Sequence, residues 1–178
     1  MKKNLFLVCL FMFGTLASCQ CSSKKSADNT VVNTTETPVP LGDPFILLHD
    51  GVYYAYGTHS NKGIEFYTSD DLLTWKYGGL ALNKEDSWAD RWFWAPEIYF
   101  VNGKFYMYYS ADEHICVAVA DSPTGPFVQD KKEPMIADEK CIDNSLFIDD
   151  NGTPYLSFVR FNDGNNIWIA ELLSLIHI

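Results

Sequence analysis

The sequence is poor in positive charge. Its 178 residues hold 13 Lys and Arg against 23 Asp and Glu, so the net charge is −10 at pH 7. The basic residues form no cluster, and nucleic acids and anionic lipid surfaces are therefore not expected as partners. The acidic balance is compatible with an uncharged ligand such as a neutral polysaccharide.

Helical periodicity is also missing. Downstream of residue 40, no segment of useful length repeats its apolar residues at helical spacing. Aromatic residues, by contrast, make up 15% of the chain, and Tyr, Phe and Trp pack well on pleated sheets. The chain is long enough to bury a core of its own. These features predict one all-β domain.

Cysteine and histidine are too scattered to form a metal site. Of the five cysteines, only Cys116 and Cys141 fall in the expected domain, and they lack the spacing of metal ligands. The histidines form no ligand cluster either: His49, His59, His114 and His177. No metal site, cofactor or catalytic Cys/His pair is therefore expected in this chain. The two domain cysteines are expected to be separate buried thiols, with a disulfide as the alternative in an exported protein.

The N-terminus has the pattern of a targeting segment. A charged start, "KK", precedes an apolar stretch over residues 5–13 that is too short to span a membrane. It is followed by "LASC", residues 16–19, which resembles a bacterial lipobox. We expect a lipoprotein signal peptide over residues 1–18 and lipidation of Cys19. The alternative is an ordinary secretory signal with an incidental cysteine.

Lipidation of Cys19 predicts an exported bacterial lipoprotein that is anchored to a membrane of the cell envelope, on the periplasmic or outer-membrane face. Residues 19–40 consist mainly of Ser, Thr, Asn, Lys and Pro, with almost no large apolar residues. Such a composition cannot form a core, so this segment is expected to be a flexible tether.

Three similar segments recur at intervals of about fifty residues. "DPFILLHDGVYYAYGT" begins at Asp43, "APEIYFVNGKFYMYYS" at Ala95 and "DNSLFIDDNGTPYLSF" at Asp143. Each pairs two apolar or aromatic stretches around an Asp-Gly or Asn-Gly turn, which is the strongest short-range signal for a β-hairpin. Further strands are expected from a second set of similar segments, which start at Ile64, Ile115 and Ile167. Units of about four strands at this period predict a β-propeller.

The chain is too short for a closed propeller. Its domain covers fewer than three units, whereas propellers typically close with four to eight blades. The turn at Asp70 and Asp121, which follows the third strand of units one and two, is replaced in unit three by Leu173 and an apolar "SLIHI". We expect a partial propeller over residues 41–172, and an atypical tail over residues 173–178 that could be non-native.

Two acidic residues stand at matching places outside the pattern that builds the strands. Asp43 and Asp143 begin the first strands of units one and three. In a propeller the first strand of each blade lines the central channel, so these side chains should converge on one pocket. Two carboxylates facing one cavity are what glycoside hydrolysis requires. The alternative is that each Asp only caps the turn before its strand.

The ordered motifs of the chain resemble those of glycoside hydrolase family 43. They are "GDPFILLHDGVYYAYGT", "SDDLLTW", "WFWAPEIYFVNGKFYMYYS", "ADSPTGPF" and "CIDNSLFIDDNGTPYLSF", and they cover about residues 41–172. The resemblance implies a five-bladed β-propeller that inverts configuration at the anomeric carbon. Members of this family act mainly as β-xylosidases, α-L-arabinofuranosidases and arabinanases. A related five-bladed family that acts on sucrose or fructans is the alternative, against which "WAPE" and "IDNSLF" argue.

The resemblance also implies roles for single residues. Asp43 is similar to the general base, and Asp143 is similar to the acid that raises the pKa of the general acid and orients it. The general acid is a Glu that this chain does not contain. Trp94 and Glu97 are expected as substrate-binding residues of the pocket wall. The alternatives are core packing between blades for Trp94, and a structural role or that of a surrogate acid for Glu97. Asn144 departs from the commoner Pro or Ala, and some members hold a calcium ion on residues of later blades.

The sequence therefore predicts an inverting glycosidase that hydrolyses O-glycosyl bonds in xylan- or arabinan-derived glycans and is incomplete in this chain. Its partner would be a neutral oligosaccharide or polysaccharide. The chain by itself is expected to lack useful activity, because the proton donor is missing from it. A non-catalytic glycan-binding lipoprotein on the same propeller is the alternative function.

Overall fold

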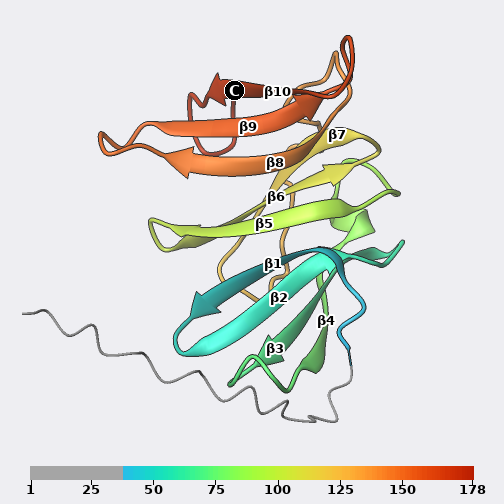
Figure 1. Ribbon diagram of the computed structural model, residues 1–178, viewed down its shortest axis with the longest axis vertical. Coiled ribbons are helices and arrows are strands. Elements are labelled where there is room, and N and C mark those ends of the chain that lie inside the picture. Colours follow the sequence, from blue (N-terminus) through green and yellow to red (C-terminus); the bar gives the residue numbers. More distant parts are fainter. Residues whose placement is uncertain (1–37) are drawn as a thin grey trace, which may run out of the picture. The chain divides into compact units, whose positions relative to one another are not determined.

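The computed structural model describes residues 38–178, which form small antiparallel sheets (Figure 1). The predicted signal peptide over residues 1–18, the predicted lipid site at Cys19 and most of the predicted tether over residues 19–40 lie outside this described part. Within residues 38–178, no helix is both long and apolar enough to cross a membrane.

The first sheet is a complete four-stranded blade. Its strands follow the chain in the order β1-β2-β3-β4, and their bounds are β1 Gly42–His49, β2 Val52–Thr58, β3 Gly63–Ser69 and β4 Lys76–Asn83. Asp50 and Gly51 connect β1 to β2 with φ angles of 48° and 79°. Two successive positive φ angles match the twist of a tight hairpin, which is why Asp-Gly is favoured here. A short 3-10 helix η1, Lys84–Asp86, follows the blade.

The second and third sheets have three strands each. Their strand bounds are β5 Trp94–Val101, β6 Lys104–Ala111, β7 His114–Ala120, β8 Cys141–Ile148, β9 Pro154–Arg160 and β10 Asn166–Glu171. The expected unit of about four strands is therefore reached only in the first blade. After β7, a single antiparallel bridge joins Val119 and Val128. This segment contains Pro123, Pro126 and Pro134, and proline cannot donate a hydrogen bond to a strand ladder.

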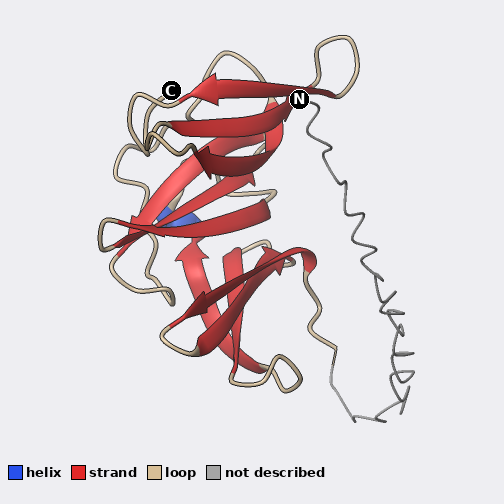
Figure 2. Ribbon diagram, turned by 60° about the vertical axis from the view of Figure 1, so that its left-hand side comes forward, coloured by secondary structure: helices blue, strands red, loops and turns tan. Residues whose placement is uncertain are grey.

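The first strands of the three blades lie next to one another, because β5 contacts both β1 and β8 (Figure 1). The sheets pack face to face in sequence order (Figure 2). One buried cluster fills the space between blades one and two, and includes Tyr56, Leu82 and Met107. A second cluster lies between blades two and three, and includes Tyr108, Leu146 and Leu156. Each fully buried side chain of this size contributes about 1.5 to 3 kcal/mol relative to its exposed state.

The outward faces of the first and third blades keep apolar side chains in solvent. On β1, Ile46 and Leu48 are 50% and 56% exposed, and on β10, Ile167 and Ile169 are 77% and 69% exposed. Apolar residues scattered singly over a surface are ordinary, but two exposed sheet faces are not. These faces have the character of blade surfaces that lack a neighbour among the described residues.

The tail over residues 173–178 folds back toward blades two and three. The hydroxyl of Tyr108 donates to the carbonyl oxygen of Leu175 at 2.6 Å, and the tail closes on itself through a bridge between Ser174 and His177. Leu173 is 85% exposed, so the tail contributes little apolar burial at its start.

Cys116 and Cys141 are free thiols and both are buried. Burial raises the pKa of the Cys116 thiol to about 12 and raises the pKa of the Cys141 thiol as well. A thiol held in its neutral form is a poor nucleophile and a poor metal ligand. The expectation of two separate buried thiols agrees with this state.

Candidate active site

Each inner strand is interrupted by a bulge at the same place. The residue in the bulge has a positive φ angle, of 45° at Asp43, 42° at Ala95 and 56° at Asp143. The strand register shifts around these residues, between Gly42 and Phe45, between Trp94 and Glu97, and between Ile142 and Ser145. Residues other than glycine rarely adopt this conformation, and such strain is concentrated at functional sites. A bulge also re-aims the side chain that it carries.

Asp43 is exposed in the bulge of β1 and is held by one side chain of β2. Thr58 Oγ1 donates to Asp43 Oδ2 at 2.7 Å, and the same Thr58 oxygen accepts the backbone N–H of Ala95 at 3.0 Å. Gly57 precedes Thr58, and a Cβ atom at Gly57 would lie 2.5 Å from the carbonyl oxygen of Gly42. Only glycine permits this close approach of β2 to the bulge.

Asp143 occupies the equivalent bulge of β8 and is also tied to the preceding blade. Its backbone N–H donates to Ser110 Oγ at 3.3 Å. Partial burial raises the pKa of the Asp143 carboxyl, and the negative charge of Asp43 raises this pKa further. Both effects disfavour the ionised form of Asp143. The charge of Asp43 on blade one thus acts on the carboxyl group of Asp143 on blade three.

The second blade brings no carboxylate to the equivalent position, which is occupied by Ala95. Glu97 lies two residues further along β5, at the position that Phe45 and Ser145 hold in the other blades. The Tyr99 hydroxyl donates to Glu97 and accepts the backbone N–H of Leu146 at 3.1 Å. Glu97 thus takes part in a contact that joins β5 to β8.

Trp94, at the start of β5, is half-buried and stacks on a second tryptophan that the sequence analysis did not single out. The ring centroids of Trp92 and Trp94 are 5.8 Å apart with an interplanar angle of 11°. The guanidinium of Arg91 lies 4.4 Å from the centroid of the Trp92 ring. Three aromatic residues in the run "WFW" were the available signal for this stack.

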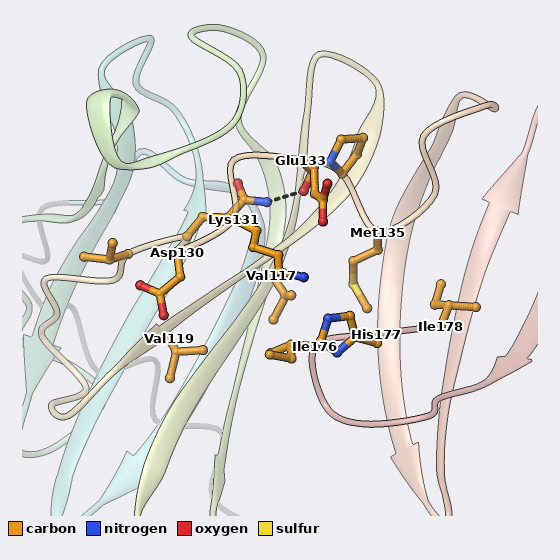
Figure 3. Close-up of a pocket in the computed structure, with 12 residues that line it drawn as sticks. Val117, Val119, Asp130, Lys131, Glu133, Met135, Ile176, His177 and Ile178 are labelled. Atoms are coloured by element: carbon orange, nitrogen blue, oxygen red, sulfur yellow. Dashed lines mark hydrogen bonds between the residues drawn. The ribbon is translucent and has the colours of Figure 1, made fainter.

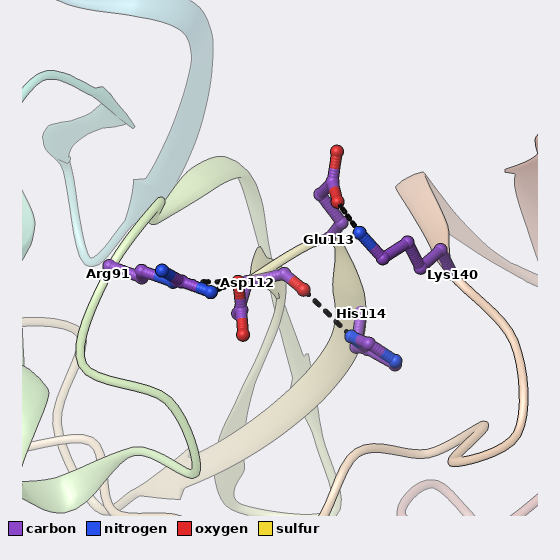
Figure 4. Close-up of polar contacts among 5 residues, drawn as sticks. All are labelled: Arg91, Asp112, Glu113, His114 and Lys140. Carbon is purple, nitrogen blue, oxygen red and sulfur yellow. Dashed lines mark hydrogen bonds and ion pairs between the residues drawn. The ribbon is translucent and has the colours of Figure 1, made fainter.

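A polar cluster surrounds the turn between β6 and β7 (Figure 4). Arg91 Nη2 lies 2.8 Å from Asp112 Oδ1, and the side chain of Lys140 pairs with Glu113. His114 Nδ1 lies 2.8 Å from the carbonyl oxygen of Asp112. Because a carbonyl only accepts, Nδ1 carries the proton in this contact.

The same turn fixes the start of β8. The carbonyl oxygen of Glu113 accepts the backbone N–H of Cys141 at 2.9 Å, two residues before Asp143. Ser110, which accepts the N–H of Asp143, is the penultimate residue of β6 and lies only three positions before Glu113. The second blade thereby positions the acidic bulge of the third blade at two points.

A cavity of about 280 Å³ lies elsewhere, beside β7 (Figure 3). Its lining includes Val117, Val119 and Met135 together with Ile176 and Ile178 of the tail. None of the three bulge residues lines it. Its walls mix these apolar side chains with charged and polar ones, and the two acids among them, Asp130 and Glu133, do not lie at the starts of the inner strands.

Metal ligands are also scattered in the described part of the chain. No group of three or more His, Cys, Asp or Glu side chains over residues 38–178 is arranged to hold a metal ion. The bulges themselves carry two carboxyl groups, with Thr58 and Ser110 as hydroxyl partners.

The fold and its acidic bulges define a partial β-propeller with a candidate active site at the starts of its inner strands. The chain belongs to glycosyl hydrolases family 43, because the model of that family matches residues 35–175. The prediction of an all-β, five-bladed propeller with fewer than three complete blades in this chain is confirmed.

Three relatives illustrate this membership. The chain is 37% identical over 167 residues to "Xylosidase/arabinosidase 43A" of Humicola insolens, which covers 76% of this chain and 50% of the relative. It is 27% identical over 148 residues to "Extracellular exo-alpha-(1->5)-L-arabinofuranosidase ArbA" of Cellvibrio japonicus, with coverage of 71% and 42%. The crystal structure of an endo-1,4-beta-xylanase from Bacteroides thetaiotaomicron matches with a TM-score of 0.71 and 52% identity, over 75% of this chain and 47% of that one. The chain spans about half the length of these relatives.

Proposed function

We propose that the full-length protein is an inverting glycoside hydrolase, and that Asp43 and Asp143 are two of its catalytic acids. The observation that carries this proposal is the pair of strained acidic bulges on β1 and β8, whose carboxyl groups interact. Membership of family 43 supports the same reaction class. Inverting hydrolysis needs one group to activate water and another to protonate the leaving oxygen.

Asp43 is assigned the role of general base. Thr58 occupies Oδ2 of this carboxylate, which leaves Oδ1 to accept a hydrogen bond from the attacking water. An exposed carboxylate in a fixed orientation is suited to take a proton from that water. No metal ion is needed for this step.

Asp143 is assigned the role of modulator. A negative charge near the general acid keeps that acid protonated, because it disfavours a second ionised carboxylate. The general acid itself is proposed to lie in the part of the full-length protein that this chain does not include.

The assignment of Trp94 and Glu97 to the pocket wall stays a prediction. The aromatic face of Trp94 is suited to pack against the apolar face of a sugar ring.

The substrate class is a neutral glycan derived from xylan or arabinan. The relatives are named for xylosidase, arabinosidase, arabinofuranosidase and xylanase activities. The net charge of −10 suits an uncharged substrate better than a polyanion.

The protein is further proposed to be exported and anchored to the cell envelope through Cys19. Cys19→Ala should therefore abolish fatty-acid labelling and membrane retention.

The test of function uses the longest natural reading frame that contains this chain. Aryl xylosides and aryl arabinofuranosides are supplied, and the anomeric configuration of the first sugar released is followed by NMR. The expected product has the opposite configuration to the substrate. Release of a sugar with the same anomeric configuration as the substrate contradicts the inverting assignment. Binding of xylan or arabinan oligosaccharides without any release favours the non-catalytic alternative.

A further inference from the structure

The hydroxyl of Thr58 lies between the candidate base and the backbone of the next blade. It donates to Asp43 Oδ2 at 2.7 Å, and it accepts from the N–H of Ala95 at 3.0 Å. We propose that Thr58 is a positioning residue that orients the Asp43 carboxylate for catalysis and couples this orientation to the second blade. The inference rests on the proposed function, because it presumes that Asp43 acts as the base.

The direction of the two hydrogen bonds follows from the chemistry of the groups. A backbone amide can only donate, and a carboxylate can only accept. The single hydroxyl proton of Thr58 must therefore point at Asp43, while its oxygen faces Ala95. Of the two carboxylate oxygens of Asp43, Oδ2 is the one that accepts this proton. Oδ2 is held, and Oδ1 is left for the attacking water.

Asp43 needs this restraint because little else holds its side chain. The residue is exposed. Among residues 38–178, the hydrogen bond to the side chain of Asp43 comes from Thr58. Its backbone is strained at a φ angle of 45°. An exposed aspartate without a partner samples several rotamers, and a general base that is misplaced by about 1 Å can lose rate by roughly 10²-fold.

The same device recurs one blade further on, which argues against a chance contact. Thr58 pairs with Gly42 in the strand register, and Ser110 pairs with Trp94. Both hydroxyls accept the N–H of the left-handed bulge residue in the following blade, Ala95 in one case and Asp143 in the other. The hydroxyl beside the expected base makes the additional bond to a carboxylate. The third blade carries Val159, which has no hydroxyl, at the corresponding place. Among the described residues, this hydroxyl contact is therefore found only between blades one and two and between blades two and three.

The test compares Thr58→Val, which removes the hydroxyl at nearly constant volume, with Thr58→Ser, which keeps it. In the full-length protein, Thr58→Val should lower kcat by about 10- to 100-fold, and KM should change by less than about twofold because the ground-state contacts to the sugar remain. Thr58→Ser should restore most of kcat. Thr68→Val on β3 is the matched control, and should leave kcat unchanged.

Two further readouts separate a positioning role from a general structural effect. In the Asp43→Asn background, Thr58→Val should cause no further loss of kcat, because the base that it positions is already disabled. In crystal structures, Asp43 should keep one rotamer in the wild type and in Thr58→Ser, and should occupy others in Thr58→Val. Thr58→Ala replaces Thr58→Val if the valine variant does not fold.

The outcomes distinguish this inference from the proposed function. If Asp43→Asn is inactive while Thr58→Val keeps wild-type kcat and a single Asp43 rotamer, the function stands and the positioning role is overturned. If the wild-type protein releases no sugar, the proposed function fails. In that case the rotamers of Asp43 decide alone whether Thr58 orients this carboxylate.

Discussion

Asp43 and Asp143 lie in equivalent left-handed bulges of two strands that belong to blades one and three, and the charge of the first raises the pKa of the second. They are 100 positions apart in the sequence. The intervening blade brings them together while contributing Ala95, without a carboxyl group, at its own bulge. This arrangement places two interacting acids in one region and leaves the second blade to supply backbone and hydroxyl contacts.

The first prediction concerns the coupling of these two acids. Replacing Asp43 by Asn removes the negative charge that disfavours ionisation of Asp143, so the pKa of Asp143 should fall. NMR titration of the Asp143 carboxyl carbon in both proteins measures the change. Asp50→Asn, at the turn that joins β1 to β2, is the control and should leave the Asp143 titration in place. An unchanged or higher midpoint in Asp43→Asn would show that the two carboxyls do not interact.

The second prediction concerns Asn144, which follows Asp143 in the third bulge. The equivalent residues are Pro44 and Pro96. Asn144 is buried, and its side-chain oxygen and nitrogen have no hydrogen-bond partner among residues 38–178. A buried polar group without a partner costs about 1 to 3 kcal/mol, and proline also restricts the unfolded chain.

Asn144→Pro should therefore stabilise the fold by about 1 kcal/mol or more. The measurement is the midpoint of urea unfolding at neutral pH, with Asn144→Ala as the comparison that removes the buried amide without adding proline. A lower midpoint for Asn144→Pro would mean that the amide or its backbone N–H makes a contact that stabilises the native protein.

The third prediction concerns the turn after β3. The pKa of Asp71 is lowered, first by the backbone N–H of Thr74 and then by that of Leu73, and Oδ1 of Asp71 lies 2.7 Å and 2.8 Å from these nitrogens. A carboxyl whose pKa is lowered in the folded state adds stability above its unfolded pKa and loses this contribution as the pH falls.

Asp71→Asn should accordingly be less stable than the wild type at neutral pH, and the difference should shrink as the pH falls below about 4. Unfolding curves recorded across this pH range test the prediction. Asp70→Asn changes the neighbouring charge in the same exposed turn and serves as the control. A stability difference that is independent of pH would exclude the carboxylate's ionisation as its cause.

The fourth prediction concerns the junction of blades two and three. Tyr99 links Glu97 to the backbone of Leu146, and its own pKa is raised to about 12, mainly by burial. Tyr99→Phe should lower the free energy of unfolding by about 1 to 3 kcal/mol, because it leaves a partly buried N–H without an acceptor. Tyr106→Phe on β6, where no such bond is lost, should cost less. Equal losses in the two variants would contradict this account.

Several features of the site were predictable from the repeat. The alignment of the three segments put Asp43, Ala95 and Asp143 in register, and the structure places all three in equivalent bulges. This worked because hairpin turns such as Asp50-Gly51 fix the register of their strands from short-range sequence. The same periodicity, however, suggested four strands in every unit. In blade two, the prolines after β7 leave only the bridge at Val128.

Other features depend on contacts between blades, which no local pattern encodes. Thr58 is the last residue of an aromatic strand. Nothing in the neighbouring sequence indicates that its hydroxyl forms hydrogen bonds with a carboxylate from β1 and a backbone amide from β5. The stacking of Trp92 on Trp94 could not be predicted either, because neighbouring tryptophans could equally pack in the core. Glu97 was expected in the pocket wall, and the strand register places it two residues beyond the bulge.

The most direct test of the account is the activity of Asp43→Asn in the full-length protein on an aryl glycoside with a good leaving group. Such a substrate needs little help from the general acid, and the rate then depends on activation of water by the base. For Asp43→Asn we predict that kcat/KM falls by at least about 10²-fold, whereas the control Asp50→Asn stays at the wild-type value. A rate for Asp43→Asn within a few-fold of the wild type would contradict the assignment of Asp43 as the general base.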